Sequence, residues 1–135
     1  MAPTKINHIG IAVRDLESAK AFYAGALGLN VEHEEILGDM KIAFIPVGEV
    51  NLELIQCVTD DGVIAKFIAK KGEGIHHIAY AVEDVSAALE ALKAQGAKLV
   101  DEKPRKGAHG TEVAFVHPKS TFGVLTELVG EGTKD

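Results

Sequence analysis

The sequence contains no tryptophan and a single cysteine, Cys57, among 135 residues. A lone cysteine cannot form an internal disulfide, and no Cys-x-x-Cys pair is present for redox or zinc chemistry. Aromatic residues make up only 5% of the chain, which leaves little surface for stacking against single-stranded nucleic acid. No apolar run approaches the roughly 20 residues that a membrane-spanning helix requires. These absences argue against a disulfide scaffold, a nucleic-acid binder and a membrane protein.

Positive charge is also scarce, with 14 basic residues against 20 acidic ones and a net charge of -6. A negative net charge opposes binding to a phosphate polymer unless positive charge is concentrated. It is concentrated in one loop, which holds Lys103, Arg105 and Lys106. That loop has two interpretations: a solvated surface segment, or a contact for one anionic small molecule.

The composition is typical of a globular protein, with 47% apolar and 25% charged residues. A chain of 135 residues fits one domain built from two small modules. The N-terminal sequence lacks the basic stretch, long apolar core and small-residue cleavage site of a signal peptide, so we expect a cytoplasmic location.

An internal repeat organises the chain. The segment 5–16, KINHIGIAVRDL, aligns without a gap with the segment 74–85, GIHHIAYAVEDV. Each has the apolar pattern of a half-buried strand and then an aspartate, Asp15 or Asp84, that can cap a helix. Apolar residues at helical spacing follow each aspartate, so the sequence predicts a strand that leads into a helix twice.

Three further strands are predicted after each helix, at 30–37, 40–47 and 50–57 and at 97–101, 111–117 and 122–129. An amphipathic stretch within 59–73 predicts a helix that connects the halves. The expected fold is therefore α+β, with two tandem β-α-β-β-β modules that form one curved eight-stranded assembly around a metal site. The modules occupy about 4–58 and 74–130 of a single domain.

Two histidines and two glutamates recur at matched places in the repeat. His8 and His77 lie on the first strand of each module, and Glu53 and Glu127 lie on the last. A single strand histidine is more often a core residue than a ligand, but the fourfold coincidence favours a shared site. Mixed nitrogen and oxygen ligation suits one divalent ion such as Co, Mn, Ni, Zn or Fe, and octahedral geometry would leave two positions open for substrate.

Four motifs carry a resemblance to a known family: NHIGIAV, IAKF, GIHHIA, and HPKS followed by GVLTEL. At these residues the chain resembles the vicinal oxygen chelate superfamily and, within it, the methylmalonyl-CoA epimerases. The resemblance implies paired modules around a divalent metal that binds two neighbouring substrate oxygens. It also implies the ligands His8, Glu53, His77 and Glu127, although some members have glutamine in place of Glu53.

The implied activity is that of an isomerase that interconverts (R)- and (S)-methylmalonyl-CoA by removing the proton on carbon 2, through a metal-stabilised enolate. Glu127 is the expected base, with Glu53 near the opposite face of the carbon. Some epimerases carry a glutamate where our alignment places Lys41, which makes Lys41 a weaker candidate for proton transfer. Candidate contacts for the CoA phosphates are Lys103, Arg105, Lys106 and Lys119.

Two alternatives remain open at this point. One is a glyoxalase I-like lyase acting on glutathione hemithioacetals, because a site with two histidines and two glutamates could serve there too. The other is a metal-free small-molecule-binding module of the same fold. We also expect a homodimer, because open curved sheets leave edges and apolar surface to cover.

Overall fold

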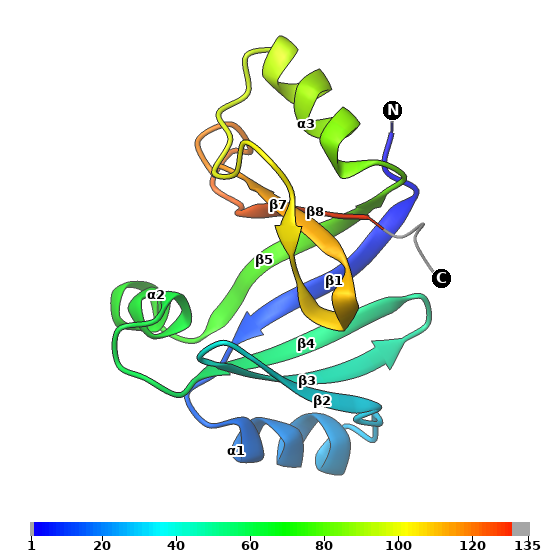
Figure 1. Ribbon diagram of the computed structural model, residues 1–135. Coiled ribbons are helices and arrows are strands. Elements are labelled where there is room, and N and C mark those ends of the chain that lie inside the picture. Colours follow the sequence, from blue (N-terminus) through cyan, green and yellow to red (C-terminus); the bar gives the residue numbers. More distant parts are fainter. Residues whose placement is uncertain (1, 131–135) are drawn as a thin grey trace. The chain divides into compact units, whose positions relative to one another are not determined.

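A computed structural model describes residues 2–130. The first module contains β1 (Lys5–Ala12), α1 (Leu16–Lys20), a helical turn (Ala21–Ala26), β2 (His33–Leu37), β3 (Met40–Val47) and β4 (Val50–Cys57). The helix α2 (Val63–Lys71) follows. The second module contains β5 (Gly74–Val82), α3 (Val85–Ala94), β6 (Arg105–Lys106), a short turn (Ala108–Gly110), β7 (Glu112–Val116) and β8 (Thr126–Gly130). Figure 1 shows these elements in sequence order by colour.

The described strands are hydrogen-bonded in the order β2-β3-β4-β1-β5-β8-β7-β6, which confirms an α+β fold with an eight-stranded sheet. The chain divides into two compact units, of which one comprises His8–His76 and the other residues 2–7 and 77–130. Strands β1 and β5 each pass from one unit to the other. No helix in the described range is long and apolar enough to cross a membrane.

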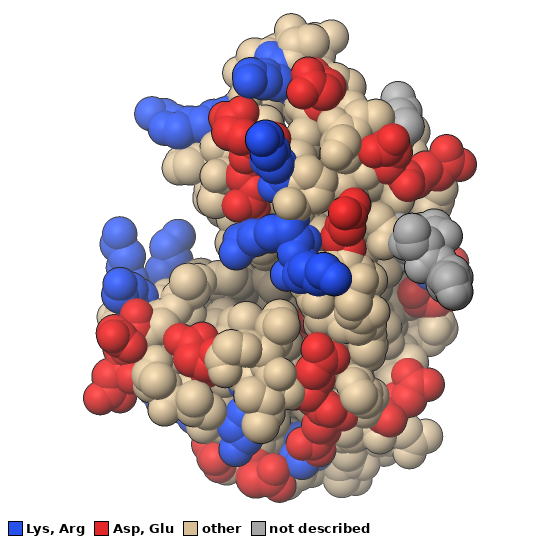
Figure 2. Space-filling view, viewed as in Figure 1, with Lys and Arg blue, Asp and Glu red and all other residues tan. Residues whose placement is uncertain are grey.

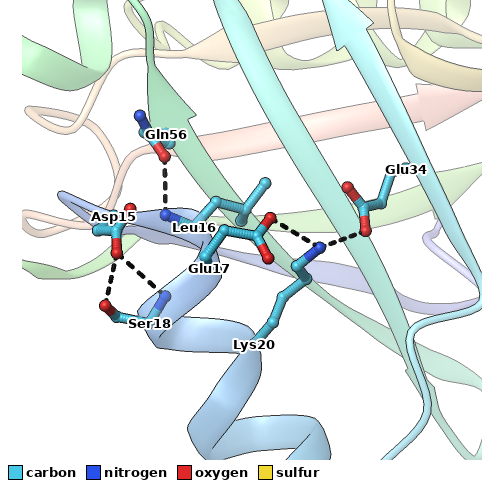
Figure 3. A network of polar contacts seen from close by, with 7 residues as sticks. All are labelled: Asp15, Leu16, Glu17, Ser18, Lys20, Glu34 and Gln56. Atoms are coloured by element: carbon cyan, nitrogen blue, oxygen red, sulfur yellow. Dashed lines mark hydrogen bonds and ion pairs between the residues drawn. The ribbon is translucent and has the colours of Figure 1, made fainter.

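The start of α1 is fixed by polar contacts (Figure 3). The side chain of Asp15 accepts hydrogen bonds from the backbone N–H and the hydroxyl of Ser18, and these bonds lower the pKa of Asp15. The backbone N–H of Leu16 donates to Oε1 of Gln56 on β4, at 2.7 Å. These contacts satisfy N–H groups at the helix end that have no partner within the helix, as the sequence predicts for an N-cap aspartate.

The same capping recurs at α3, where the Asp84 side chain accepts from the backbone N–H of Ala87 at 3.1 Å. The two predicted helices also end alike, because Gly28 (φ +87°) and Gly96 (φ +88°) adopt the left-handed conformation that glycine tolerates best. The first helix differs in its second half. There it widens into a π-helical turn over Ala21–Ala26, with the Leu27 N–H bonded to the Phe22 carbonyl.

Each module has one sheet face that packs on a helix. In the first unit, Leu16 of α1 packs with Val13, Ala43, Ile45 and Leu54. In the second unit, α3 packs on the side chains of Val82, Ala114, Val116 and Leu128. Because strand residues alternate between faces, the intervening residues of the same strands point away from these helices.

The predicted bounds of two strands in the second module are wrong. The expected strand at 97–101 is reduced to an isolated bridge between Leu99 and Val116, and the short β6 lies further along the chain, after Pro104. At Asp101 the backbone N–H donates to the Phe115 carbonyl at 3.2 Å, and the side chain accepts the N–H of Phe115 at 2.8 Å. The expected strand at 122–129 begins only at Thr126, because Phe122 (φ +59°) and Gly123 (φ +98°) have turn conformations that a strand cannot contain.

Candidate functional site

The first unit contains a buried pair formed by His8 and Glu53. His8 comes from β1, and Glu53 comes from β4 beside it in parallel register. Nδ1 of His8 lies 3.2 Å from Oε2 of Glu53, and both side chains are buried. A buried carboxylate is costly unless it is paired or bound to a metal, so its position among buried apolar residues points to a chemical role.

The second unit contains the equivalent pair, His77 and Glu127. Nε2 of His77 lies 3.0 Å from Oε1 of Glu127, and both side chains are again buried. Strand β5 supplies the histidine, and β8, its parallel neighbour, supplies the glutamate. The two pairs differ in one detail, because His8 makes its contact through Nδ1 and His77 through Nε2.

The strand register of the two pairs is identical. Glu53 is aligned with Gly10, two residues after His8. Glu127 is aligned with Ala79, two residues after His77. Small residues at these positions leave room beside each carboxylate. The duplication seen in the sequence therefore extends to the way in which the first and last strands of each module are paired.

These four side chains are the only buried polar or charged residues of the described range. Two imidazole nitrogens and two carboxylates form the mixed nitrogen and oxygen donor set that divalent transition metals accept. The donor chemistry of each pair thus suits a divalent metal.

An aromatic residue accompanies each pair and was not identified from the sequence. Phe44 of β3 lies directly opposite Glu53, and Phe115 of β7 lies directly opposite Glu127. The signal was available, because Ala-Phe followed by a β-branched residue occurs at 43–45 and again at 114–116. The alignment of the histidine segments did not extend that far, since the loops between them differ in length.

Lys41 is not brought to Glu53. On β3, Lys41 is aligned with Gln56 of β4, whereas Phe44 is aligned with Glu53. Lys41 therefore lies on the face that α1 covers, and its charge helps to lower the pKa of Asp15 at the start of that helix. The β3 residues that share the face of Glu53 are apolar, Ile42 and Phe44. The geometry argues against the proton-transfer role considered for Lys41.

The neighbouring histidine on β5 lies on the opposite face from His77, as the strand alternation predicts. The ring of His76 contacts the ring of Phe67 on α2 edge to face, with 4.9 Å between ring centroids. His76 thus has a packing contact on the face opposite His77.

The four candidate cations for CoA occupy two exposed segments of the second unit. Arg105 and Lys106 form β6, with Lys103 just before it in the chain. Lys119 lies in the turn before β8, where its backbone N–H donates to Nδ1 of His117. Figure 2 shows Lys and Arg side chains gathered over the segment around β6.

Comparison with known proteins gives concordant results. Residues 7–115 match the model of the glyoxalase/bleomycin resistance protein/dioxygenase superfamily. The chain is 41% identical over 128 residues to ethylmalonyl-CoA/methylmalonyl-CoA epimerase of Cereibacter sphaeroides, covering 92% of this chain and 96% of that protein. It is 39% identical over 127 residues to the mitochondrial methylmalonyl-CoA epimerase of Homo sapiens, covering 92% and 72%.

A solved structure is equally similar. Streptomyces coelicolor methylmalonyl-CoA epimerase, in a variant form bound to 2-nitronate-propionyl-CoA, superposes with a TM-score of 0.92 at 35% identity, covering 98% of this chain and 97% of that one. The repeat, the duplicated His–Glu pairs and this similarity along nearly the whole chain agree. The chain belongs to the glyoxalase/bleomycin resistance protein/dioxygenase superfamily and is an enzyme of its methylmalonyl-CoA epimerase family.

Proposed function

We propose that this protein interconverts the two epimers of methylmalonyl-CoA by proton transfer at carbon 2. The observation that carries the proposal is the duplicated buried pair, His8 with Glu53 at 3.2 Å and His77 with Glu127 at 3.0 Å. Relatives and solved structures named as epimerases of this substrate support the choice of reaction.

The proposed metal site combines both pairs, so that His8, Glu53, His77 and Glu127 hold one divalent ion per chain. Its support is the donor chemistry, the matched register and the chain path. Both histidines stand where the strands pass from one unit to the other, at the boundaries 7/8 and 76/77. When bound, the ion supplies a Lewis acid that stabilises negative charge developing on two substrate oxygens.

The proton steps are assigned to the carboxylates. In the proposed reaction a Glu127 oxygen accepts the proton from carbon 2. The electron pair of the broken C–H bond forms a C=C bond to the thioester carbon, and the carbonyl π pair moves onto the thioester oxygen to give an enolate. Inversion then requires a proton from the opposite side, for which Glu53 is the candidate donor. Lys41 has no part in this scheme, because it lies on the other sheet face from Glu53.

The test is hydrogen exchange in heavy water. With methylmalonyl-CoA, the wild-type protein should replace the carbon-2 hydrogen with deuterium while the epimers interconvert, since both outcomes share one enolate. Glu127→Gln should abolish exchange and still retain metal, because an amide oxygen can bind a metal but cannot take up the proton.

The alternative within the superfamily has a clear signature in the same assay. If the protein leaves methylmalonyl-CoA unexchanged and converts a glutathione hemithioacetal, the glyoxalase-like reaction replaces the epimerase. If neither substrate reacts and metal addition changes nothing, the metal-free binding module is the better description. The homodimer and the cytoplasmic location stay predictions from the sequence; sedimentation of the purified protein measures the first.

A further inference from the structure

The two cations of β6 face opposite sides of the sheet. Arg105 is aligned with Val113 of β7, and Lys106 is aligned with Glu112. Val113 and Phe115 point to the face that carries Glu127, as the β7–β8 register requires. Arg105 therefore shares the face of the buried His77–Glu127 pair, whereas Lys106 shares the face that α3 covers.

The Arg105 side chain is held by two contacts. Its Nε donates to Oδ2 of Asp101 at 3.3 Å, and its Cζ lies 5.3 Å from the centroid of the Phe115 ring. The same Asp101 oxygen accepts the backbone N–H of Phe115 at 2.8 Å. One carboxylate oxygen thus fixes both the guanidinium and the strand on which the ring stands. The cation–π contact with the Phe115 ring also helps to hold the Arg105 guanidinium in place.

The ring beneath Arg105 also contacts the candidate site. Phe115 meets the His77 ring edge to face, with 5.6 Å between centroids and 83° between planes. Arg105 therefore lies one aromatic ring away from a proposed metal ligand. Its side chain is 57% exposed, and among the described residues its terminal Nη groups make no hydrogen bond. The planar guanidinium can donate two parallel N–H hydrogen bonds, so its exposed Nη groups are suited to binding an oxyanion.

The backbone of the loop supports this placement. A Cβ atom on Gly107, the residue after β6, would lie 2.6 Å from Cγ1 of Val113. Glycine therefore permits the chain to approach β7 closely enough for Arg105 to reach the Phe115 ring. The contact pattern is specific to Arg105, because Lys103 and Lys106 have no equivalent aromatic support.

We propose that Arg105 binds an oxyanion of the acyl-CoA substrate, while Asp101 and Phe115 act as positioning residues that hold its guanidinium beside the site. This inference rests on the proposed function for the identity of the substrate. The oxyanion has two possible sources, a phosphate of the CoA moiety or the malonyl carboxylate, and both present the oxygens that an arginine fork recognises.

The experiment compares Arg105→Gln with the control Lys93→Gln, which removes a similarly exposed positive charge from α3, the helix on the opposite sheet face. Exchange kinetics are measured with methylmalonyl-CoA and with methylmalonyl-pantetheine, which lacks the CoA phosphates. Arg105→Gln should raise the KM for methylmalonyl-CoA by about 10-fold or more, with kcat within a few fold, because it removes a charge-assisted hydrogen bond. Lys93→Gln should change the KM by less than about 2-fold, because an exposed ion pair such as Lys93–Glu102 contributes little.

The two substrates identify the oxyanion. If Arg105→Gln raises the KM only for the CoA thioester, the ligand is a phosphate; if it raises both equally, the ligand is the carboxylate. Equal effects of the two variants, or no effect of Arg105→Gln, would overturn the proposal. Titration of CoA and of methylmalonate by calorimetry separates this test from the reaction, since the arginine site can bind either probe in a protein that performs no exchange.

Asp101→Asn tests the positioning role. The amide oxygen can still accept the N–H of Phe115, but the charge that holds Arg105 is lost. We expect the KM for methylmalonyl-CoA to rise about 3- to 10-fold with kcat and melting temperature nearly unchanged. The double variant should have the same KM as Arg105→Gln alone, because Asp101 acts through Arg105. A lower melting temperature with unchanged KM would show that Asp101 only supports the fold, and the positioning role would then be wrong.

Discussion

Phe115 lies directly opposite Glu127 in the antiparallel pair of β7 and β8. Phe44 has the same relationship to Glu53 in the pair of β3 and β4. Each candidate carboxylate therefore stands between a histidine-bearing strand and a phenylalanine-bearing strand, in both halves of the chain. What stacks on each ring differs: His33 packs on Phe44 with 5.3 Å between centroids, and Arg105 packs on Phe115. The two modules thus share the arrangement of histidine, glutamate and phenylalanine but place different side chains, His33 and Arg105, against the phenylalanine rings.

The first prediction concerns the metal. The purified protein should contain about one divalent ion per chain by elemental analysis, and His77→Ala should lower the metal affinity by about 10-fold or more, since even losses among residues supporting a ligand cost that much. His76→Ala is the matched control, because it removes the adjacent imidazole from the opposite sheet face. Equal metal content in the two variants would rule out His77 as a ligand.

The second prediction concerns Lys41. Because its side chain lies on the helix-covered face with Gln56, Lys41→Ala should leave the rate of carbon-2 exchange within a few fold of wild type. Steady-state exchange kinetics measure this. A loss comparable to that of Glu127→Gln would mean that Lys41 reaches the substrate and that the assignment of faces is wrong.

The third prediction concerns a close approach at Gly62. A Cβ there would lie 2.2 Å from Sγ of Cys57 and 2.3 Å from Oδ2 of Asp39, so Gly62→Ala should lower the free energy of unfolding by about 1–3 kcal/mol. Gly25→Ala is the control, since its Cβ would meet nothing within 4 Å and should stabilise the protein by about 0.4–1 kcal/mol. Urea denaturation compares the two; equal stabilities would contradict the packing around Gly62.

The fourth prediction concerns acid stability. Hydrogen bonds from Ser18 lower the pKa of Asp15 below its ordinary value of 3.8. The stability that the Asp15 carboxylate contributes is therefore fully present above that value and is lost as the pH falls through the lower native pKa. Asp15→Asn keeps an oxygen for capping but does not titrate. The difference in urea midpoint between wild type and variant should be constant near neutral pH and shrink below about pH 4; parallel profiles throughout would refute the linkage.

The pH dependence of the contribution that Lys20 makes to stability has the opposite sign, which provides an internal check. Its ammonium donates to Glu34 and Glu17, which raises the pKa of Lys20 above 10.5. Its contribution to stability is therefore present below that value and is lost only as the pH rises through the higher native pKa. The contribution of Asp15 to stability is lost at low pH and that of Lys20 at high pH. The two ends of the profile of stability against pH therefore report different contacts of the first helix.

Much of the architecture was determined by the sequence itself. The repeated strand and capped helix follow from local rules, because a run of alternating apolar residues and an aspartate before a helical pattern act over a few neighbouring residues. The sequence also identified the candidates His8, Glu53, His77 and Glu127. A polar residue that recurs at the same place in two apolar strand segments can be seen in a repeat without a structure.

Other features were decided only by tertiary structure. Strand register sets which residues share a sheet face, and a shift by one residue moves a side chain to the opposite side. That is why Lys41 could be considered beside Glu53 from the sequence and is separated from it in the fold. The same dependence hid Phe44 and Phe115, whose place opposite the glutamates is a property of strand pairing. It also decided that Arg105, and not the adjacent Lys106, lies on the face of His77, because the direction of a side chain in β6 depends on its partner in β7.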